Sequence, residues 1–262
     1  GTITIMGDQL NYEPDEDANG QDVFSYTVSD GWFTDTALIT VTIHPIEDPP
    51  TLKPIADQNV LEDTHSYPVS LSNITSGAFN ETQTLTVTAQ TDIGESTLPN
   101  PIVVYNTANT TGTLLLTPSP NQSGLASVRV TVNDGKKTVN DTFQVTVEPV
   151  NDPPSVSNIE TTLSEDHDPI SIRIIPNHTS DVDGDLLAIT DLGTPLGGQV
   201  SLQSVEVISY EPSQDWYGLD VFTYTVTDPG GLSGTGTITI NVDPVNDRPT
   251  LGIITDVDIN ED

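Results

Sequence analysis

The stretch "DVFTYTVTDPGGLSGTGTITINVDPVNDRP", residues 220–249, decides the fold class that this sequence predicts. Phe222, Tyr224 and Val226 alternate with threonines, and the apolar residues of "GTITINV" repeat the alternation after a Gly-rich break. A period of two over about six residues indicates half-buried β-strands. The proline-flanked acidic hexapeptide that follows is unsuited to a central strand, because proline donates no backbone hydrogen bond. The stretch therefore predicts two strands followed by a stiff linker.

The same landmarks recur along the chain in the same order. The hexapeptide appears as "PIEDPP" at 45–50, as "PVNDPP" at 149–154 and as "PVNDRP" at 244–249. The first of the two strands returns as "DVFSYTVSDG" at 22–31 and as "ASVRVTVNDG" at 126–135. Self-similarity at a period of roughly 100 residues is the signature of a domain array.

Each period carries about seven short strands broken by Gly, Pro, Asn and Asp, which is typical of an Ig-like sandwich. We therefore expect an all-β fold of tandem Ig-like antiparallel β-sandwiches in an end-to-end array. The landmarks divide the chain into the C-terminal part of a repeat at 1–50, complete repeats at 51–154 and 155–249, and the first strand of a following repeat at 250–262. Half a sandwich cannot bury its own apolar face, so we expect the first part to be unstable alone or to pair elsewhere.

The composition excludes several classes of partner. The 262 residues include 39 acidic and 6 basic side chains, for a formal net charge of −33. Nucleic-acid binding depends on cationic side chains that contact phosphates, so nucleic acid is excluded and an anionic membrane surface is disfavoured. The chain has no cysteine, which excludes disulfides, thiolate metal sites and cysteine nucleophiles. No apolar run approaches the ~18 residues of a membrane helix and no leader is evident, so we expect a soluble segment of a longer protein without membrane insertion.

The stretch "VTDPGGLSGTGTITINVDPVNDRP" resembles the end of a cadherin repeat, in which an Asp–x–Gly loop, a Ser/Thr-rich last strand and an acidic linker ending in proline follow in this order. It is most similar to the bacterial cadherin-like tandem repeats of large surface adhesins. The resemblance implies a cadherin-like sandwich, an extracellular or cell-surface location, and Ca²⁺ held by acidic residues between successive repeats.

A crowded loop supports a cation on chemical grounds. In "DVDGD", Asp181, Asp183 and Asp185 stand at alternating positions around Gly184. Two carboxylates at ~4 Å repel by about 4 kcal/mol at a surface-like dielectric, so such crowding indicates a bound cation. Ca²⁺ takes about six to eight oxygen ligands. Thr190 stands where a helix–loop–helix calcium loop would need Glu, so the other ligands must come from elsewhere in the fold.

The resemblance implies a ligand set for each linker. For the linker at 149–154, the implied ligands are Glu62, Asp63, Asn151, Asp152, Asp181, Asp183, Asp185 and Asp228. For the linker at 45–50 they are Glu47, Asp48, Glu81 and Asp134, with Asn80 and Gln83 nearby; for the linker at 244–249 they are Glu165, Asp166, Asn246 and Asp247. We expect weaker or fewer ions at 45–50, because "FNETQTL" stands there in place of "DVDGDLL".

Asp and Asn are also natural turn residues, so Asx turns and solubilising surface charge are the alternative interpretation of these acids. The alternative stays fully open for Asp185, and for Asp30 and Asp134, each of which begins an Asp-Gly turn dipeptide.

Two functions compete. The first is a calcium-rigidified stalk segment of an extracellular adhesin, whose partners are the neighbouring repeats of the same chain. The alternative is a carbohydrate-binding or homophilic-binding cadherin-like module, whose partners are cell-surface glycans or like domains and whose best candidate contact is Trp32. We do not expect an enzyme, because the sequence has no phosphate-binding loop and no nucleophile elbow, and its four histidines share no metal-ligand spacing.

Overall fold

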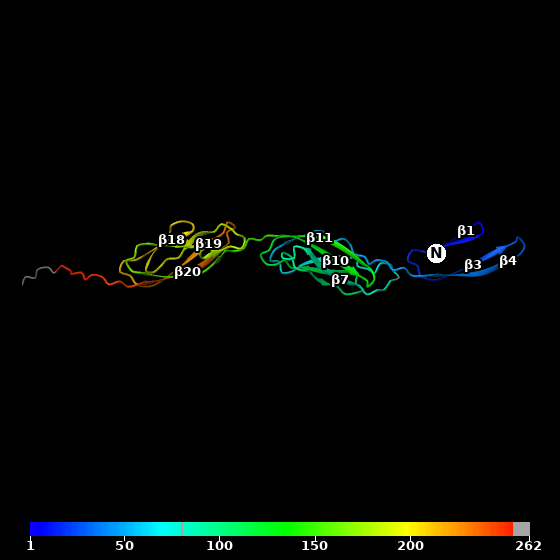
Figure 1. The fold of residues 1–262 in the computed structure, drawn as a ribbon, viewed down its shortest axis with the longest axis horizontal. Helices are drawn as coiled ribbons and strands as arrows, with labels where there is room; N and C mark the ends of the chain where they lie inside the picture. The colour runs from blue at the N-terminus through cyan, green and yellow to red at the C-terminus, as the bar shows by residue number, and fades with distance from the viewer. Residues whose placement is uncertain (80, 254–262) are drawn as a thin grey trace, which may run out of the picture. The chain divides into compact units, whose positions relative to one another are not determined.

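The computed structural model describes residues 1–79 and 81–253, and the regular elements in these ranges are all β-strands (Figure 1). The chain divides into two compact units, of which the first spans Gly1–Val150 and the second begins at Asn151. The all-β prediction is therefore confirmed. No helix in the described ranges is both long and apolar enough to cross a membrane.

The second unit is a sandwich of a four-stranded and a three-stranded sheet, with β18, β19 and β20 labelled in Figure 1. The larger sheet has the order β13 (Ile159–Ser164), β20 (Ser233–Asp243), β19 (Gly218–Thr227) and β16 (Ala188–Leu192). The smaller sheet has the order β14 (Ile170–Arg173), β18 (Val207–Pro212) and β17 (Gly198–Leu202), and β12 (Ser155–Val156) pairs with β15 (Thr179–Ser180).

One edge pair departs from the antiparallel pattern. β13 pairs in parallel with β20, with Ile159 opposite Ile238, whereas the other pairs of this unit are antiparallel. Parallel strands need a long connection between them. The rest of the sandwich supplies that connection here, because β13 and β20 are its first and last long strands.

The alternating residues of the deciding stretch form the core of this sandwich. Phe222, Tyr224 and Val226 on β19 are buried, and the apolar residues of β20 are buried with them. The Phe222 ring stacks on Tyr210 of β18 at a centroid distance of 5.8 Å, so the core joins the two sheets. The predicted period of two is thus the period of side chains that point into the sandwich.

Residues 51–150 of the first unit form a second sandwich with the same strand order. Its larger sheet has the order β5 (Gln58–Leu61), β11 (Thr138–Glu148), β10 (Gly124–Asn133) and β7 (Thr86–Ile93). Its smaller sheet has the order β6 (Tyr67–Ser72), β9 (Thr111–Leu116) and β8 (Ile102–Val104). β5 again pairs in parallel with the last strand, and a cluster of buried residues from both sheets forms the core.

The first 43 residues form two hairpins, β1 (Thr2–Met6) with β2 (Gln9–Glu13) and β3 (Gly20–Ser29) with β4 (Thr34–Ile43). Their sequences match β17 to β20, but their apolar faces are more exposed. Tyr26 is 39% exposed and Val28 is 58% exposed, whereas their counterparts Tyr224 and Val226 are fully buried. The strand predicted at 250–262 lies outside the described residues from position 254 onwards.

Candidate metal centres

The loop at 181–185 brings its three aspartates together. Asp181, Asp183 and Asp185 each place one carboxylate oxygen within 4.8 Å of the others. The backbone amides of Asp183 and Asp185 donate to Asp181 Oδ1 at 2.9 and 3.3 Å, so the loop curls around that carboxylate. Gly184 permits this turn with a φ of +78°. The remaining oxygen, Asp181 Oδ2, is buried without a hydrogen-bond partner.

The electrostatics of this loop favour a cation. Burial raises the pKa of Asp185 above its ordinary value, and the charges of Asp181, Asp228 and Asp183 raise it further. A raised carboxyl pKa means that the surroundings disfavour the ionised form of Asp185. A divalent cation would relieve that repulsion and satisfy the open oxygen of Asp181.

Two linker residues are held by the same group of acids. The Asn151 amide donates to Asp228 Oδ2 at 2.8 Å, and the Asp152 backbone amide donates to Asp183 Oδ2 at 2.8 Å. Burial acts to raise the pKa of Asp228, but the hydrogen bonds from Asn151 and from backbone amides of its own loop outweigh it and hold that pKa below its ordinary value. Gly230 leaves room for Asn151, because a Cβ there would lie 2.7 Å from Asn151 Oδ1.

The acidic pairs Glu62–Asp63 and Glu165–Asp166 adopt the same local structure, one in each unit. Glu62 and Glu165 are buried, and their Oε1 atoms accept hydrogen bonds from the backbone amides of the linkers, at Val150 (2.8 Å) and Val245 (2.6 Å). Asp63 and Asp166 follow in the left-handed region, with φ of 63° and 57°.

A second cluster of carboxylates lies in the second unit and includes a residue that the sequence analysis missed. Asp166, Asp215 and Asp247 place carboxylate oxygens within 4.8 Å of one another. Burial raises the pKa of Asp247, and the charges of Asp215, Asp166 and Glu165 raise it further. The missed signal was the alignment of "YEPSQD" with "LTPSPN", which places Asp215 opposite Asn121, whose backbone amide donates to Asp63. The side-chain amide of Asn246 donates to the Asp247 carbonyl at 3.1 Å.

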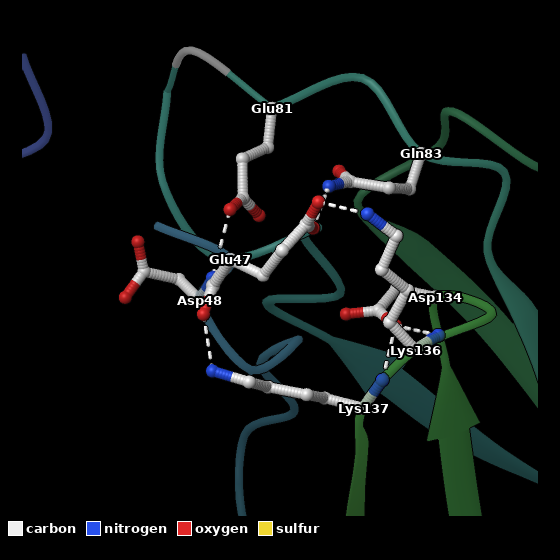
Figure 2. A network of polar contacts seen from close by, with 7 residues as sticks. All are labelled: Glu47, Asp48, Glu81, Gln83, Asp134, Lys136 and Lys137. Atoms are coloured by element: carbon white, nitrogen blue, oxygen red, sulfur yellow. Dashed lines mark hydrogen bonds and ion pairs between the residues drawn. The ribbon is translucent and has the colours of Figure 1, made fainter. Parts of the chain in front are cut away.

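The acids around the 45–50 linker are arranged differently (Figure 2). The Asp48 backbone amide donates to Glu81 Oε1 at 2.8 Å, and Gln83 donates to Glu47 Oε2 at 2.7 Å. Two lysines that the sequence analysis did not consider contact Glu47. Asn80 lies outside the described residues.

Asp134 and Asp30 both form turns. Asp134 Oδ1 accepts the backbone amides of Lys136 and Lys137 at 2.7 and 2.6 Å, and Asp30 Oδ1 accepts those of Trp32 and Phe33 at 2.8 and 2.7 Å. These are the contacts of the alternative interpretation for these two residues. Asp134 is nonetheless buried, and its Oδ2 has no hydrogen-bond partner.

Several solved structures match most of the chain at low sequence identity. The human desmocollin-1 ectodomain matches 87% of the chain with 47% of its own length, at 16% identity and a TM-score of 0.49. An endo-fucoidan hydrolase of glycoside hydrolase family 107 matches 94% of the chain with 37% of its own length, at 16% identity and a TM-score of 0.36. Protocadherin gamma B2 matches 92% with 49% of its length, at 14% identity and a TM-score of 0.41. The chain thus spans less than half of each of these proteins, and no curated protein matches it.

The family comparison is more specific. The model of the bacterial Ig domain matches residues 1–42 and 151–241, which together are just over half of the chain. The second match covers the sandwich of β12 to β20, and the first covers the two hairpins that share its sequence pattern. The chain belongs to the bacterial Ig domain family.

Proposed function

We propose that this chain is a calcium-rigidified stalk segment of an extracellular adhesin, in which Ca²⁺ joins successive Ig-like repeats. The observation that carries the proposal is the aspartate loop at 181–185, where three carboxylates converge and Asp181 Oδ2 is buried without a partner. The linker amide of Asp152 is hydrogen-bonded to the same loop. A cation bound there would act on the linker as well as on the loop.

The ligand set consists of hard oxygens, which Ca²⁺ prefers. In the second unit the proposed ligands are Asn151, Asp152, Asp181, Asp183, Asp185 and Asp228. Glu62 and Asp63 of the preceding repeat would complete the set, as the cadherin resemblance implies. A cation bound to both repeats would remove the hinge freedom of the linker and turn a string of sandwiches into a semi-rigid rod.

The cluster of Asp166, Asp215 and Asp247 has the same proposed role at the next linker. Glu165 is hydrogen-bonded to the Val245 amide, as Glu62 is to the Val150 amide. We assign this cluster to one side of a calcium site that a following repeat would complete.

The proposed partners are therefore the neighbouring repeats, and the proposed location is the cell surface. Extracellular calcium modules bind with affinities of roughly 10⁻⁴–10⁻³ M. Sites of that strength fill outside a cell and stay empty in the cytosol. The stalk would accordingly stiffen only after export.

Small-angle X-ray scattering of the chain in calcium and in EDTA tests the proposal. We expect calcium to narrow the range of maximum dimensions that the wild-type chain adopts. In the double variant Asp181→Asn/Asp183→Asn, calcium should leave that range unchanged. A matched control is Asp191→Asn, which removes an exposed acid of β16 outside the cluster. An identical response of the wild type and the double variant would refute the proposed mechanism.

One observation favours a second candidate, a binding module for glycans or like domains. Trp32 and Phe33 are 88% and 79% exposed in the loop between β3 and β4. Exposed aromatic rings are suited to stacking on sugars or on another protein. Retention on a glycan array that Trp32→Ala abolishes, and that EDTA does not change, would favour this function over the stalk.

A further inference from the structure

Two of the six basic residues of this strongly acidic chain are adjacent in one loop. Lys136 and Lys137 lie between β10 and β11, in the turn that begins at the buried residue Asp134. In the second unit the loop after the matching Asp228 carries Gly230 and Gly231 instead. The two loops therefore differ in charge at the place where each meets its linker.

The lysines contact the linker residue Glu47 from two directions (Figure 2). Lys136 Nζ forms an ion pair with Glu47 Oε1, and Lys137 Nζ donates to the Glu47 backbone carbonyl. The second carboxylate oxygen of Glu47 accepts the Gln83 amide at 2.7 Å. Every acceptor of Glu47 that faces the loop is thus occupied by a donor of this chain.

Glu47 is paired without a metal, whereas Glu81 Oε2 and Asp134 Oδ2 are buried nearby without hydrogen-bond partners. The Lys136 ammonium and the Glu47 carboxylate form an ion pair, so the charge of this linker residue is already balanced by a side chain. Among the described residues no three carboxylates converge here, in contrast to the loop at 181–185. An ammonium group already stands where repulsion between carboxylates would call for a cation.

We propose that Lys136 and Lys137 replace a metal ion at the 45–50 linker, so that their ammonium groups hold this linker on the β10–β11 loop without calcium. The two linkers of the chain would then respond to different conditions. The linker at 45–50 would loosen in high salt, because exposed ion pairs are screened. The linker at 149–154 would loosen in a chelator. This contrast rests on the proposed function, whereas the lysine contacts do not.

Two backbone amides report on the two linkers. The Asp48 amide donates to Glu81 Oε1, and the Asp152 amide donates to Asp183 Oδ2, both at 2.8 Å. Each is a linker amide bonded to a carboxylate of the loop that follows. Hydrogen exchange of these two amides, measured by NMR on the whole chain, therefore compares two equivalent hydrogen bonds.

The experiment uses the wild type, Lys136→Gln/Lys137→Gln, Lys136→Arg and the control Lys53→Gln, each in calcium and in EDTA. We expect EDTA to leave Asp48 protection unchanged in the wild type, and the double Gln variant to lower it by about two- to fivefold, the effect of an exposed ion pair. Lys136→Arg keeps the charge and should retain the protection, and Lys53→Gln should behave as the wild type. The Asp152 amide should lose protection in EDTA in all four chains.

Loss of Asp48 protection in EDTA, or full protection in the double Gln variant, would overturn the lysine proposal. If the protection of the Asp152 amide were the same in calcium and in EDTA while the Asp48 results were as expected, the stalk proposal would fail and the lysine proposal would stand. The core amides of β10 serve as the folding check, since a variant that unfolded the sandwich would lower their protection as well. In that case the lysine proposal is tested by the Asp48 protection in Lys136→Arg and by the dependence of wild-type Asp48 protection on salt.

Discussion

The hydroxyl of Tyr210 donates a hydrogen bond of 2.7 Å to the carboxylate of Asp220, which is fully buried in the second sandwich. Asp220 also accepts the backbone amides of Leu196 and Gly197, at 2.7 and 3.1 Å. The hydroxyl and the two amides together satisfy a carboxylate that would otherwise be costly to bury.

At the matching positions of the other repeats, the Tyr–Asp pair is either retained or replaced at both positions. The hairpins at the N-terminus retain it as Tyr12 and Asp22, again at 2.7 Å. The first complete sandwich has Leu116 and Ala126 at the matching positions, and both are buried. A polar pair and an apolar pair are both stable in a core, whereas one half of a polar pair is not.

We therefore predict that Asp220→Ala destabilises the second unit by about 3–5 kcal/mol. The change would leave the Tyr210 hydroxyl and two backbone amides in the core without a hydrogen-bond acceptor. Tyr210→Leu alone should cost about 1–3 kcal/mol, by removing one donor from the buried carboxylate. Urea unfolding of the double variant should show a smaller loss than the sum of the two. Strict additivity of the two changes would contradict the coupling between these side chains.

The Tyr12–Asp22 pair predicts a pH dependence in the N-terminal hairpins. The hydrogen bond to Asp22 raises the pKa of Tyr12 to about 12, and the same bond lowers the pKa of Asp22. The Tyr12 contribution to stability is complete below its unfolded pKa of ~10 and is lost as pH rises through about 12. The Asp22 contribution is present above its unfolded pKa of ~3.9 and is lost as pH falls through the lower folded value.

A tyrosinate absorbance titration of the wild type and of Asp22→Asn measures the first of these effects. The difference between the two chains should correspond to one of the seven tyrosines, whose pKa is about 12 in the wild type and lower in the variant. Asp8→Asn, which removes an exposed acid from the same hairpins, should leave the titration unchanged. Superimposable curves for the wild type and Asp22→Asn would exclude this pairing.

Calcium should stabilise the second unit through the loop at 181–185. At a concentration one hundred times the dissociation constant, a ligand that binds only the folded state adds about 2.7 kcal/mol. We expect the melting temperature of the wild type to rise with calcium, and that of Asp183→Asn to rise much less. Differential scanning calorimetry checks this, with the equally charged Asp191→Asn as the control. Equal calcium shifts in the two variants would remove Asp183 from the ligand set.

We predict that Gly230 affects calcium binding because it leaves space for the Asn151 side chain. A Cβ at this position would lie 2.7 Å from Asn151 Oδ1, so Gly230→Ala should displace the Asn151 side chain from Asp228. We expect a weaker calcium affinity, measured by isothermal titration calorimetry, with little change in the core. Gly252→Ala is the matched control, because a Cβ there would meet nothing within 4 Å. An unchanged affinity in Gly230→Ala would argue against Asn151 as a ligand.

Much of the fold could be predicted because its signals are local. The alternation in "DVFTYTVTD" corresponds to the buried face of β19, and the prolines stand outside the long strands that flank each linker. The convergence of Asp181, Asp183 and Asp185 was equally local, since only one residue separates each aspartate from the next along one loop. The occupancy of these sites by calcium stays a prediction.

The sequence by itself determined the strand pattern, the period of the repeat and the position of the acidic loops, because each of these depends on residues a few places apart. Only the tertiary structure decided which distant side chains meet. Lys136 reaches Glu47 across 89 positions, and Asp215 joins Asp166 and Asp247, because strand register and sheet order bring loops from the same end of a sandwich together. Such contacts leave no spacing in the sequence, since the length of chain between the partners is set by the intervening strands and not by the contact itself.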